Sequence, residues 1–314
     1  MAGVVLALAA LAAVPALLGR ETAAGFEVVA VTACALDKDG SADIIIAGDS
    51  RAKGQADPLI LSARSGKPSV NIAENLNLGG DLPTLVNVLR QRPELLAGHP
   101  LLLISVSTDG VNDCSFPNTP GAALFNYRPW EHARLVWRMP GEYPGFFASW
   151  FVPAVKRGLQ HKWRGDGFAC DGEVYLSPAL LASRGFRPMT GLRVPTGKGK
   201  PARYLIDGAR WRLFQASLAW LEASPARAVV LFDAPFSPDS VVNRRGTPAG
   251  EMELRFADQV RTAVAGRPKL RFLDFVSHGL PEFTTPDFVD AGHLRPQAAV
   301  RFTGMLADSL GLPP

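Results

Sequence analysis

A serine, an aspartate and a histidine in this sequence have the types and the setting needed for nucleophilic catalysis. Ser50 directly follows the apolar run ADIIIAGD, and Asp290 and His293 lie three residues apart in the segment VDAGHLRP. Serine attacks an ester only when a base removes its proton, and histidine does this best when a carboxylate fixes its tautomer and stabilises its charged form. We therefore expect Ser50 to be the nucleophile, His293 the base and Asp290 the residue that orients the base.

Three further segments offer hydrogen-bond donors for the same chemistry. Attack on an ester carbonyl builds negative charge on the carbonyl oxygen, and this oxyanion needs donors that are already in place. We expect these donors to be the backbone N–H of Ser50, a backbone N–H of Gly79 or Gly80 in NLGGD, and the side-chain amide of Asn112 in GVND. The choice between the two glycines stays open.

Two arginines lie beside these catalytic candidates and are candidate substrate-binding residues. Arg51 follows Ser50 directly, and Arg295 follows His293 by two residues. Either could attract an anionic group of a substrate, although surface salt bridges are the commoner role of arginine. No Cys-x-x-Cys or His-rich spacing indicates a metal site, and we expect the chemistry to need no cofactor.

The elements that must position these residues can be read from the hydrophobic pattern. Five short apolar runs lack the polar alternation of half-exposed strands, which is typical of strands buried on both faces; they span residues 42–48, 68–73, 100–107, 227–235 and 269–276. Amphipathic helical patterns separate or follow them at 81–96, 208–224, 250–266 and 295–311. This alternation predicts an α/β fold with a five-stranded parallel sheet whose two faces are both covered by helices.

The candidate residues follow the ends of different predicted strands. In an open parallel sheet, ligands bind beyond the carboxyl ends of the strands. Ser50 follows the first run, Gly79 and Gly80 follow the second, Asn112 follows the third, and the Asp290–His293 pair follows the last. We therefore expect them to meet at one edge of the sheet.

These motifs, taken together, resemble the SGNH/GDSL hydrolase superfamily. GDSRA, NLGGD, GVND and DAGH are similar to its four blocks, from about residue 42 to the C-terminus. The resemblance implies a three-layer α/β/α sandwich with flavodoxin-like topology and an acyl-serine intermediate on Ser50. The first block reads GDSR where many members have GDSL. This variant is similar to anchored members that decorate exported polysaccharides together with a membrane-bound O-acyltransferase.

Two segments depart from the regular alternation. Residues 115–202 are rich in Pro, Gly and Trp and show no clear strand–helix rhythm, so we expect an insertion that forms a lid or a partner-facing cap after the third strand. Residues 1–20 are almost wholly apolar up to Arg20, and a signal anchor, a cleaved signal peptide and a peripheral helix all remain open. We expect the division 1–20 anchor or signal, 21–41 connection, and 42–314 catalytic domain.

Composition and charge narrow the classes of partner. The formal charge is +4, but Lys and Arg are scattered rather than gathered in basic blocks, so nucleic acid is not an expected partner. No Gly-rich phosphate loop follows the first run, which disfavours a nucleotide-binding protein. We expect an acyl-ester or carbohydrate substrate and a location in the cell envelope, on the periplasmic or extracytoplasmic face. The alternative is a catalytically idle module that binds glycan or scaffolds a membrane-bound O-acyltransferase.

Overall fold

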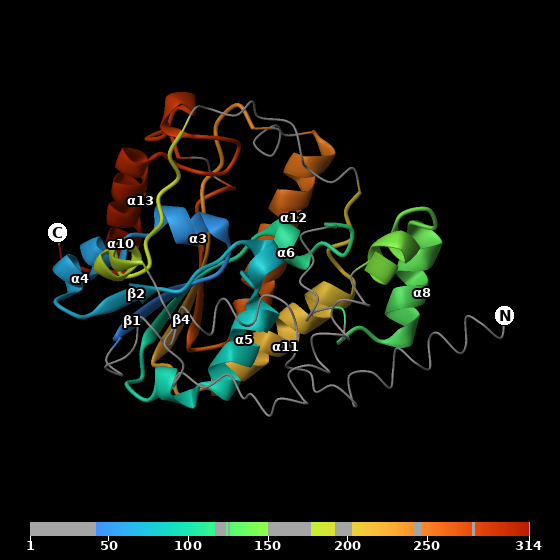
Figure 1. Ribbon diagram of the computed structural model, residues 1–314, viewed down its shortest axis with the longest axis horizontal. Coiled ribbons are helices and arrows are strands. Elements are labelled where there is room, and N and C mark those ends of the chain that lie inside the picture. Colours follow the sequence, from blue (N-terminus) through green and yellow to red (C-terminus); the bar gives the residue numbers. More distant parts are fainter. Residues whose placement is uncertain are drawn as a thin grey trace.

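The protein is built on a five-stranded parallel sheet, as predicted. The computed structural model describes residues 42–116, 124, 126–149, 177–191, 203–240, 246–277 and 280–313. The strands are β1 (Ile44–Ala47), β2 (Ser69–Asn71), β3 (Leu101–Ser105), β4 (Ala228–Asp233) and β5 (Leu270–Asp274). They pair in the order β2-β1-β3-β4-β5, and all four pairings are parallel (Figure 1). The chain therefore passes from β1 to β2 at one side of the sheet and returns past β1 to the other side.

Successive residues of each strand enter two different cores. On β1, Ile45 and Ala47 belong to one core, and Ile44 and Ile46 belong to the other. Side chains alternate across a strand, so a strand that is apolar at every position buries both of its faces. This explains why the sequence of β1 shows no polar alternation.

Helices cover both faces of the sheet and complete three layers. One core is closed by α5 (Leu82–Gln91), α11 (Ala209–Ala223) and α12 (Pro248–Val264). The other is closed by α3 (Ser50–Gln55), α4 (Pro58–Ser65) and α13 (Pro296–Ser309), which lie on the opposite side of the sheet in Figure 1. The predicted α/β class with a covered parallel sheet is confirmed.

The helix boundaries follow from local capping. Asp81 accepts a hydrogen bond from the backbone N–H of Thr84 at 2.7 Å and starts α5 as its N-cap. The helical pattern expected over 81–96 is interrupted at Pro93, where the last turn becomes the 3-10 helix η2 (Pro93–Leu96). The short helices α3, α4 and α6 (Thr108–Val111) were not among the predicted elements.

The predicted insertion is described in part. It contains α8 (Pro129–Arg138) and α10 (Pro178–Ala182). A separate small cluster of buried residues joins α8 to the start of α11; its members are Cys114, Leu124, Tyr127, Leu135, Met139, Tyr143, Leu205 and Ala209. Cys114 forms no disulfide within the described residues, and burial chiefly raises the pKa of its thiol; Cys34 and Cys170 lie outside the described residues.

The predicted anchor at 1–20 and connection at 21–41 lie outside the described residues. Among the helices that are described, none combines the length and the hydropathy that crossing a bilayer requires.

Candidate active site

Ser50 stands at the tight turn that leads from β1 into α3. Gly48 has a φ of 111° and packs so closely on the next strand that a Cβ on it would lie 2.3 Å from the carbonyl oxygen of Ser105. Only glycine tolerates both this φ and this approach. Asp49 is the N-cap of α3, and its carboxylate accepts hydrogen bonds from the backbone N–H of Arg51 and from the Ser105 hydroxyl. The turn thus fixes Ser50 as the first residue of a helix.

Ser50, His293 and Asp290 form a continuous hydrogen-bonded chain. The Ser50 Oγ lies 2.8 Å from His293 Nε2, and His293 Nδ1 lies 2.8 Å from Asp290 Oδ2 and 2.9 Å from Oδ1. Burial raises the pKa of Asp290, but the hydrogen bond from His293 and its charge outweigh burial, so the pKa is lowered. A carboxylate on one ring nitrogen and a hydroxyl on the other suit proton transfer from serine to histidine.

The loop that carries His293 is held in place from both sides. Phe288 and Leu294, both fully buried, form an antiparallel bridge across the loop, and the Val289 N–H donates to the His293 carbonyl at 2.8 Å. The Asp290 carboxylate also accepts the N–H groups of Gly292 and His293 at 2.9 Å each. These backbone contacts fix the position of the imidazole relative to Asp290.

Gln55 adds a contact that sequence reasoning missed. Its side-chain amide donates to the carbonyl oxygen of Gly292 at 2.5 Å, which links the helix of the nucleophile to the loop of the base. The two residues are 237 positions apart, and no spacing pattern in the sequence points to their contact.

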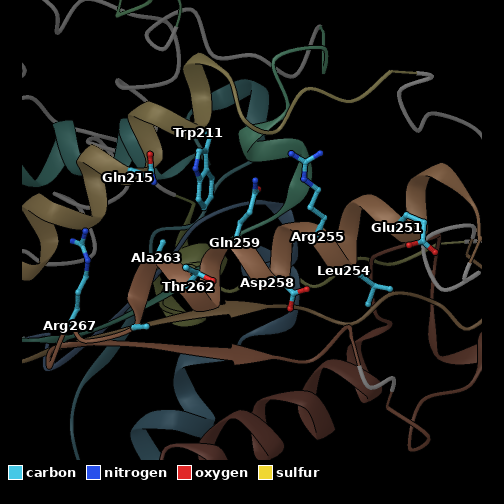
Figure 2. A pocket seen from close by; sticks show the side chains of 11 residues that line it. Trp211, Gln215, Glu251, Leu254, Arg255, Asp258, Gln259, Thr262, Ala263 and Arg267 are labelled. Carbon is cyan, nitrogen blue, oxygen red and sulfur yellow. The ribbon is translucent and has the colours of Figure 1, made fainter.

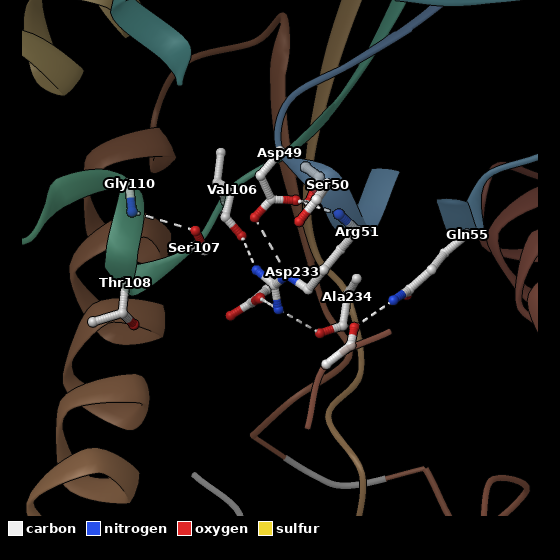
Figure 3. Close-up of polar contacts among 12 residues, drawn as sticks. Asp49, Ser50, Arg51, Gln55, Val106, Ser107, Thr108, Gly110, Asp233 and Ala234 are labelled. Carbon is white, nitrogen blue, oxygen red and sulfur yellow. Dashed lines mark hydrogen bonds and ion pairs between the residues drawn. The ribbon is translucent and has the colours of Figure 1, made fainter. Parts of the chain in front are cut away.

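Arg51 is buried and bonded to groups at the ends of two other strands. Its guanidinium donates to the carbonyl oxygens of Val106 and Ala234 at 2.8 Å each. It also pairs with Asp233 at 2.8 Å and with Asp49 at 3.3 Å, as Figure 3 shows. Arg51 thereby ties the start of α3 to the ends of β3 and β4.

This setting corrects the prediction that Arg51 binds substrate. The residue is 4% exposed, and its guanidinium also lies over the ring of Phe236 at 4.7 Å from the ring centroid. Burial alone would lower the pKa of Arg51, but the charges of Asp49 and Asp233 raise it above its ordinary value. Burial holds the pKa of Asp233 well above its usual range even though Arg51 opposes this. Arg51 is an internal cation that supports the turn of Ser50.

The predicted oxyanion donors are not all available in this structure. The Asn112 amide donates to the Arg203 carbonyl at 3.2 Å, and its oxygen accepts the N–H groups of Cys114 and Leu205. Asn112 is fully buried, and its side chain stabilises the chain segment at the end of the insertion through these hydrogen bonds. The structure therefore does not place Asn112 as a donor toward Ser50.

The two glycines differ in their relation to the nucleophile turn. A Cβ on Gly80 would lie 2.8 Å from the carbonyl oxygen of Gly48, so Gly80 packs against the turn. The N–H of Gly80 donates to the Asn75 carbonyl at 3.0 Å, and that of Gly79 makes a long 3.4 Å contact with the Leu76 carbonyl.

The Ser50 backbone N–H is the third predicted donor. Within the described part of the chain it has no acceptor. It is therefore the donor that can serve an oxyanion without rearrangement.

A wide groove lies elsewhere on the molecule. It has a volume of about 930 Å³ and runs between α11 and α12, where Trp211, Gln215, Arg255 and Gln259 line it (Figure 2). None of the predicted site residues lines this groove. In the described ranges, no group of three or more His, Cys, Asp or Glu side chains has the arrangement of a metal site.

A scan against models of protein families and a search of curated proteins both returned no match.

Proposed function

We propose that the protein is a serine-dependent ester hydrolase or O-acyltransferase that forms an acyl-serine on Ser50. The observation that carries the proposal is the 2.8 Å contact between Ser50 Oγ and His293 Nε2, with Asp290 on the far nitrogen. The substrate class we propose is an acylated carbohydrate or an exported polysaccharide. Membership of the SGNH/GDSL superfamily is part of the proposal, and the strand order β2-β1-β3-β4-β5 supports it.

The chemistry runs in two halves. His293 takes the proton of Ser50 as the Oγ attacks the ester carbonyl carbon, and the tetrahedral intermediate collapses when His293 gives that proton to the leaving alcohol. Water or a sugar hydroxyl then loses its proton to His293 and attacks the acyl-serine, which releases an acid or a new ester and restores Ser50. Asp290 stabilises the imidazolium in both halves.

The proposed location is the cell envelope, with a membrane-bound O-acyltransferase as a partner. This part rests on the apolar residues 1–18 and on the insertion after β3. Attachment to the membrane through the N-terminus would bring the catalytic domain close to the membrane-bound O-acyltransferase.

Ser50→Ala tests the proposal. The variant should lose hydrolysis of p-nitrophenyl acetate and labelling by a serine-directed organophosphate, with an unchanged circular dichroism spectrum. Ser309→Ala is the matched control, because Ser309 lies near the end of α13, where its hydroxyl bonds to the carbonyl of Met305. Undiminished hydrolysis in Ser50→Ala would end the proposal.

One observation favours a second candidate, a catalytically idle module that binds glycan or scaffolds a membrane partner. The N–H groups of Gly79 and Gly80 and the amide of Asn112 all donate to carbonyls within the protein. Incubation with p-nitrophenyl acetate followed by mass spectrometry of the peptide that contains Ser50 separates the two. An acetylated peptide supports the enzyme, and an unmodified peptide in a protein that binds glycan supports the idle module.

A further inference from the structure

Residues 184–191, here called the strap, return from the insertion and lie along the edge of the sheet next to the candidate site. The backbone N–H of Asn71 on β2 donates to the carbonyl oxygen of Arg184 at 2.9 Å. The N–H of Arg187 donates to the carbonyl oxygen of Lys53, one helical turn after Ser50, at 3.0 Å. The strap therefore covers the edge strand and reaches the helix of the nucleophile.

The far end of the strap meets the loop of the catalytic histidine. Arg295 Nη1 donates to the carbonyl oxygen of Gly191 at 3.0 Å, and Arg295 Nε donates to that of Pro286 at 3.1 Å. Arg295 follows His293 by two residues. The strap thus contacts both α3, which begins at Ser50, and the segment that follows His293.

Three cations besides Arg184 lie on the strap or on the segments that it contacts. Lys53 and Arg187 share the single carboxylate of buried Glu74, through Lys53 Nζ and through Arg187 Nη1 at 2.8 Å. Burial raises the pKa of Glu74, but its hydrogen bonds and the two cations outweigh burial, so the pKa is lowered. Within the described ranges the Arg295 side chain bonds to carbonyl oxygens only, and the Asp290 carboxylate bonds to His293. We call Lys53, Arg187 and Arg295 the cationic wall.

We propose that the cationic wall binds a negatively charged group of the carbohydrate substrate, a carboxylate or a phosphate. The inference rests on the proposed acyl-transfer function and narrows its substrate to an acidic sugar. Within the cationic wall, Arg295 is the main candidate for binding the anion. Its guanidinium has five N–H donors, and the two nitrogens that are engaged bond to neutral carbonyls. Among the described residues no carboxylate pairs with Arg295, and its remaining donors can hold an anionic oxygen of the substrate in charge-assisted hydrogen bonds.

Kinetics with matched esters tests the inference. The probes are 3-O-acetylglucose, 3-O-acetylglucuronic acid and 3-O-acetylglucose 6-phosphate, which share the acetyl position and differ only at C6. At low salt we expect kcat/KM for each charged ester to exceed that for the neutral ester about tenfold, the size of one charge-assisted contact. The excess should shrink in 0.5 M NaCl, because salt screens exposed charges.

Arg295→Gln should bring the ratio of charged to neutral kcat/KM close to one. The neutral ester is the reference, since any general loss of activity affects both terms of the ratio. Arg267→Gln is the matched control, because Arg267 precedes β5 at the opposite edge of the sheet, and it should leave the ratio unchanged. The ratios for carboxylate and phosphate probes tell which anion the wall prefers.

Binding to Ser50→Ala separates the inference from the proposed function. Calorimetry should show tighter binding of a glucuronic-acid oligosaccharide than of its neutral glucose counterpart, about tenfold, without any turnover. Charge preference in binding with no acyl-serine in the native protein would overturn the proposed function and keep the wall. Serine-dependent hydrolysis with equal ratios and equal binding would overturn the wall and keep the function. Absence of both turnover and charge preference would overturn both.

Discussion

The side chains of Ser50 and His293, 243 residues apart in the sequence, meet at 2.8 Å between Oγ and Nε2. Ser50 starts the first helix after β1, and His293 sits on the loop before the last helix. The two helices concerned, α3 and α13, pack together on one face of the sheet. The contact between Ser50 and His293 therefore depends on the packing of α3 against α13. The hydrogen bonds of Asp290 and Gln55 to the loop then fix the position of His293.

Asp290→Asn should reduce kcat about 10³- to 10⁴-fold, because the amide no longer fixes the tautomer of His293 or stabilises its charged form. The lowered pKa of Asp290 means that its carboxylate is ionised at neutral pH. Ester hydrolysis at pH 7.5 is the measurement. Asp287→Asn is the control, since Asp287 lies three residues before Asp290 and its carboxylate pairs with Arg301 of α13 instead of with His293. Equal activity of the two variants would contradict the role assigned to Asp290.

The sheet and its long helices could be predicted because each carries its own signal. Uninterrupted apolar runs gave five strands, and apolar residues at helical spacing gave α5, α11, α12 and α13. The helices α3 and α6 have six and four residues, too few to show a period, and tertiary contacts hold them in place.

The surroundings of the catalytic candidates could be predicted less well. Asn112 bonds to the carbonyl of Arg203, which lies just after the far end of the insertion. No local sequence pattern predicts a contact between residues that are 91 positions apart. Arg51 forms an ion pair with Asp233 at the end of β4. Both residues lie at the carboxyl end of a predicted strand, so opposite charges at neighbouring strand ends are the sequence signal for this contact.

Arg51→Met should destabilise the fold by about 3–5 kcal/mol, since it leaves the buried Asp49 carboxylate, whose pKa Arg51 helps to lower, without its cation. Arg227→Met, which breaks an exposed pair with Asp43, should cost no more than about 1 kcal/mol. Urea denaturation measures both. If Arg51→Met raised the KM of ester hydrolysis and left the free energy of unfolding unchanged, the prediction that Arg51 binds substrate would be correct.

Gly80→Ala should lower the free energy of unfolding by about 2 kcal/mol or more, because the new Cβ would lie 1.9 Å from the Glu74 carbonyl oxygen. It should also lower activity, because the same Cβ would displace the turn that carries Ser50. In Gly304→Ala, on α13, the new Cβ would meet no atom within 4 Å. Because alanine has the higher helix propensity, this change should raise the free energy of unfolding by about 0.5–1 kcal/mol. Thermal melts of the pair check this. Equal effects at both positions would show that close packing at Gly80 is not what matters.

The insertion should lose stability in acid through His132. Burial lowers the pKa of this histidine to about 4, and its Nδ1 lies 2.5 Å from the Tyr143 hydroxyl. An unfolded histidine titrates near 6.5, so the unfolded chain binds the proton more tightly between these two values. The contribution of neutral His132 is therefore complete above pH 6.5 and is lost as the pH falls towards 4, up to roughly 3 kcal/mol.

The difference in unfolding free energy between the native protein and His132→Phe, measured from pH 7.5 to 4.5, isolates this titration from that of the carboxylates. The same difference for His99→Asn, at an exposed histidine, serves as the control. A difference for His132→Phe that does not change with pH would contradict the assignment.

Asn112→Ala decides whether this side chain is a support or an oxyanion donor. As a support, its loss leaves the Arg203 carbonyl and the N–H groups of Cys114 and Leu205 without their partner, so we expect a destabilisation of about 2–4 kcal/mol. The folded enzyme should then keep kcat within about tenfold. Loss of an oxyanion donor costs about 10²- to 10³-fold in kcat instead. Denaturation and ester hydrolysis on the same preparation separate the two, because a large kcat loss at unchanged stability would mean that Asn112 turns toward Ser50 during the reaction.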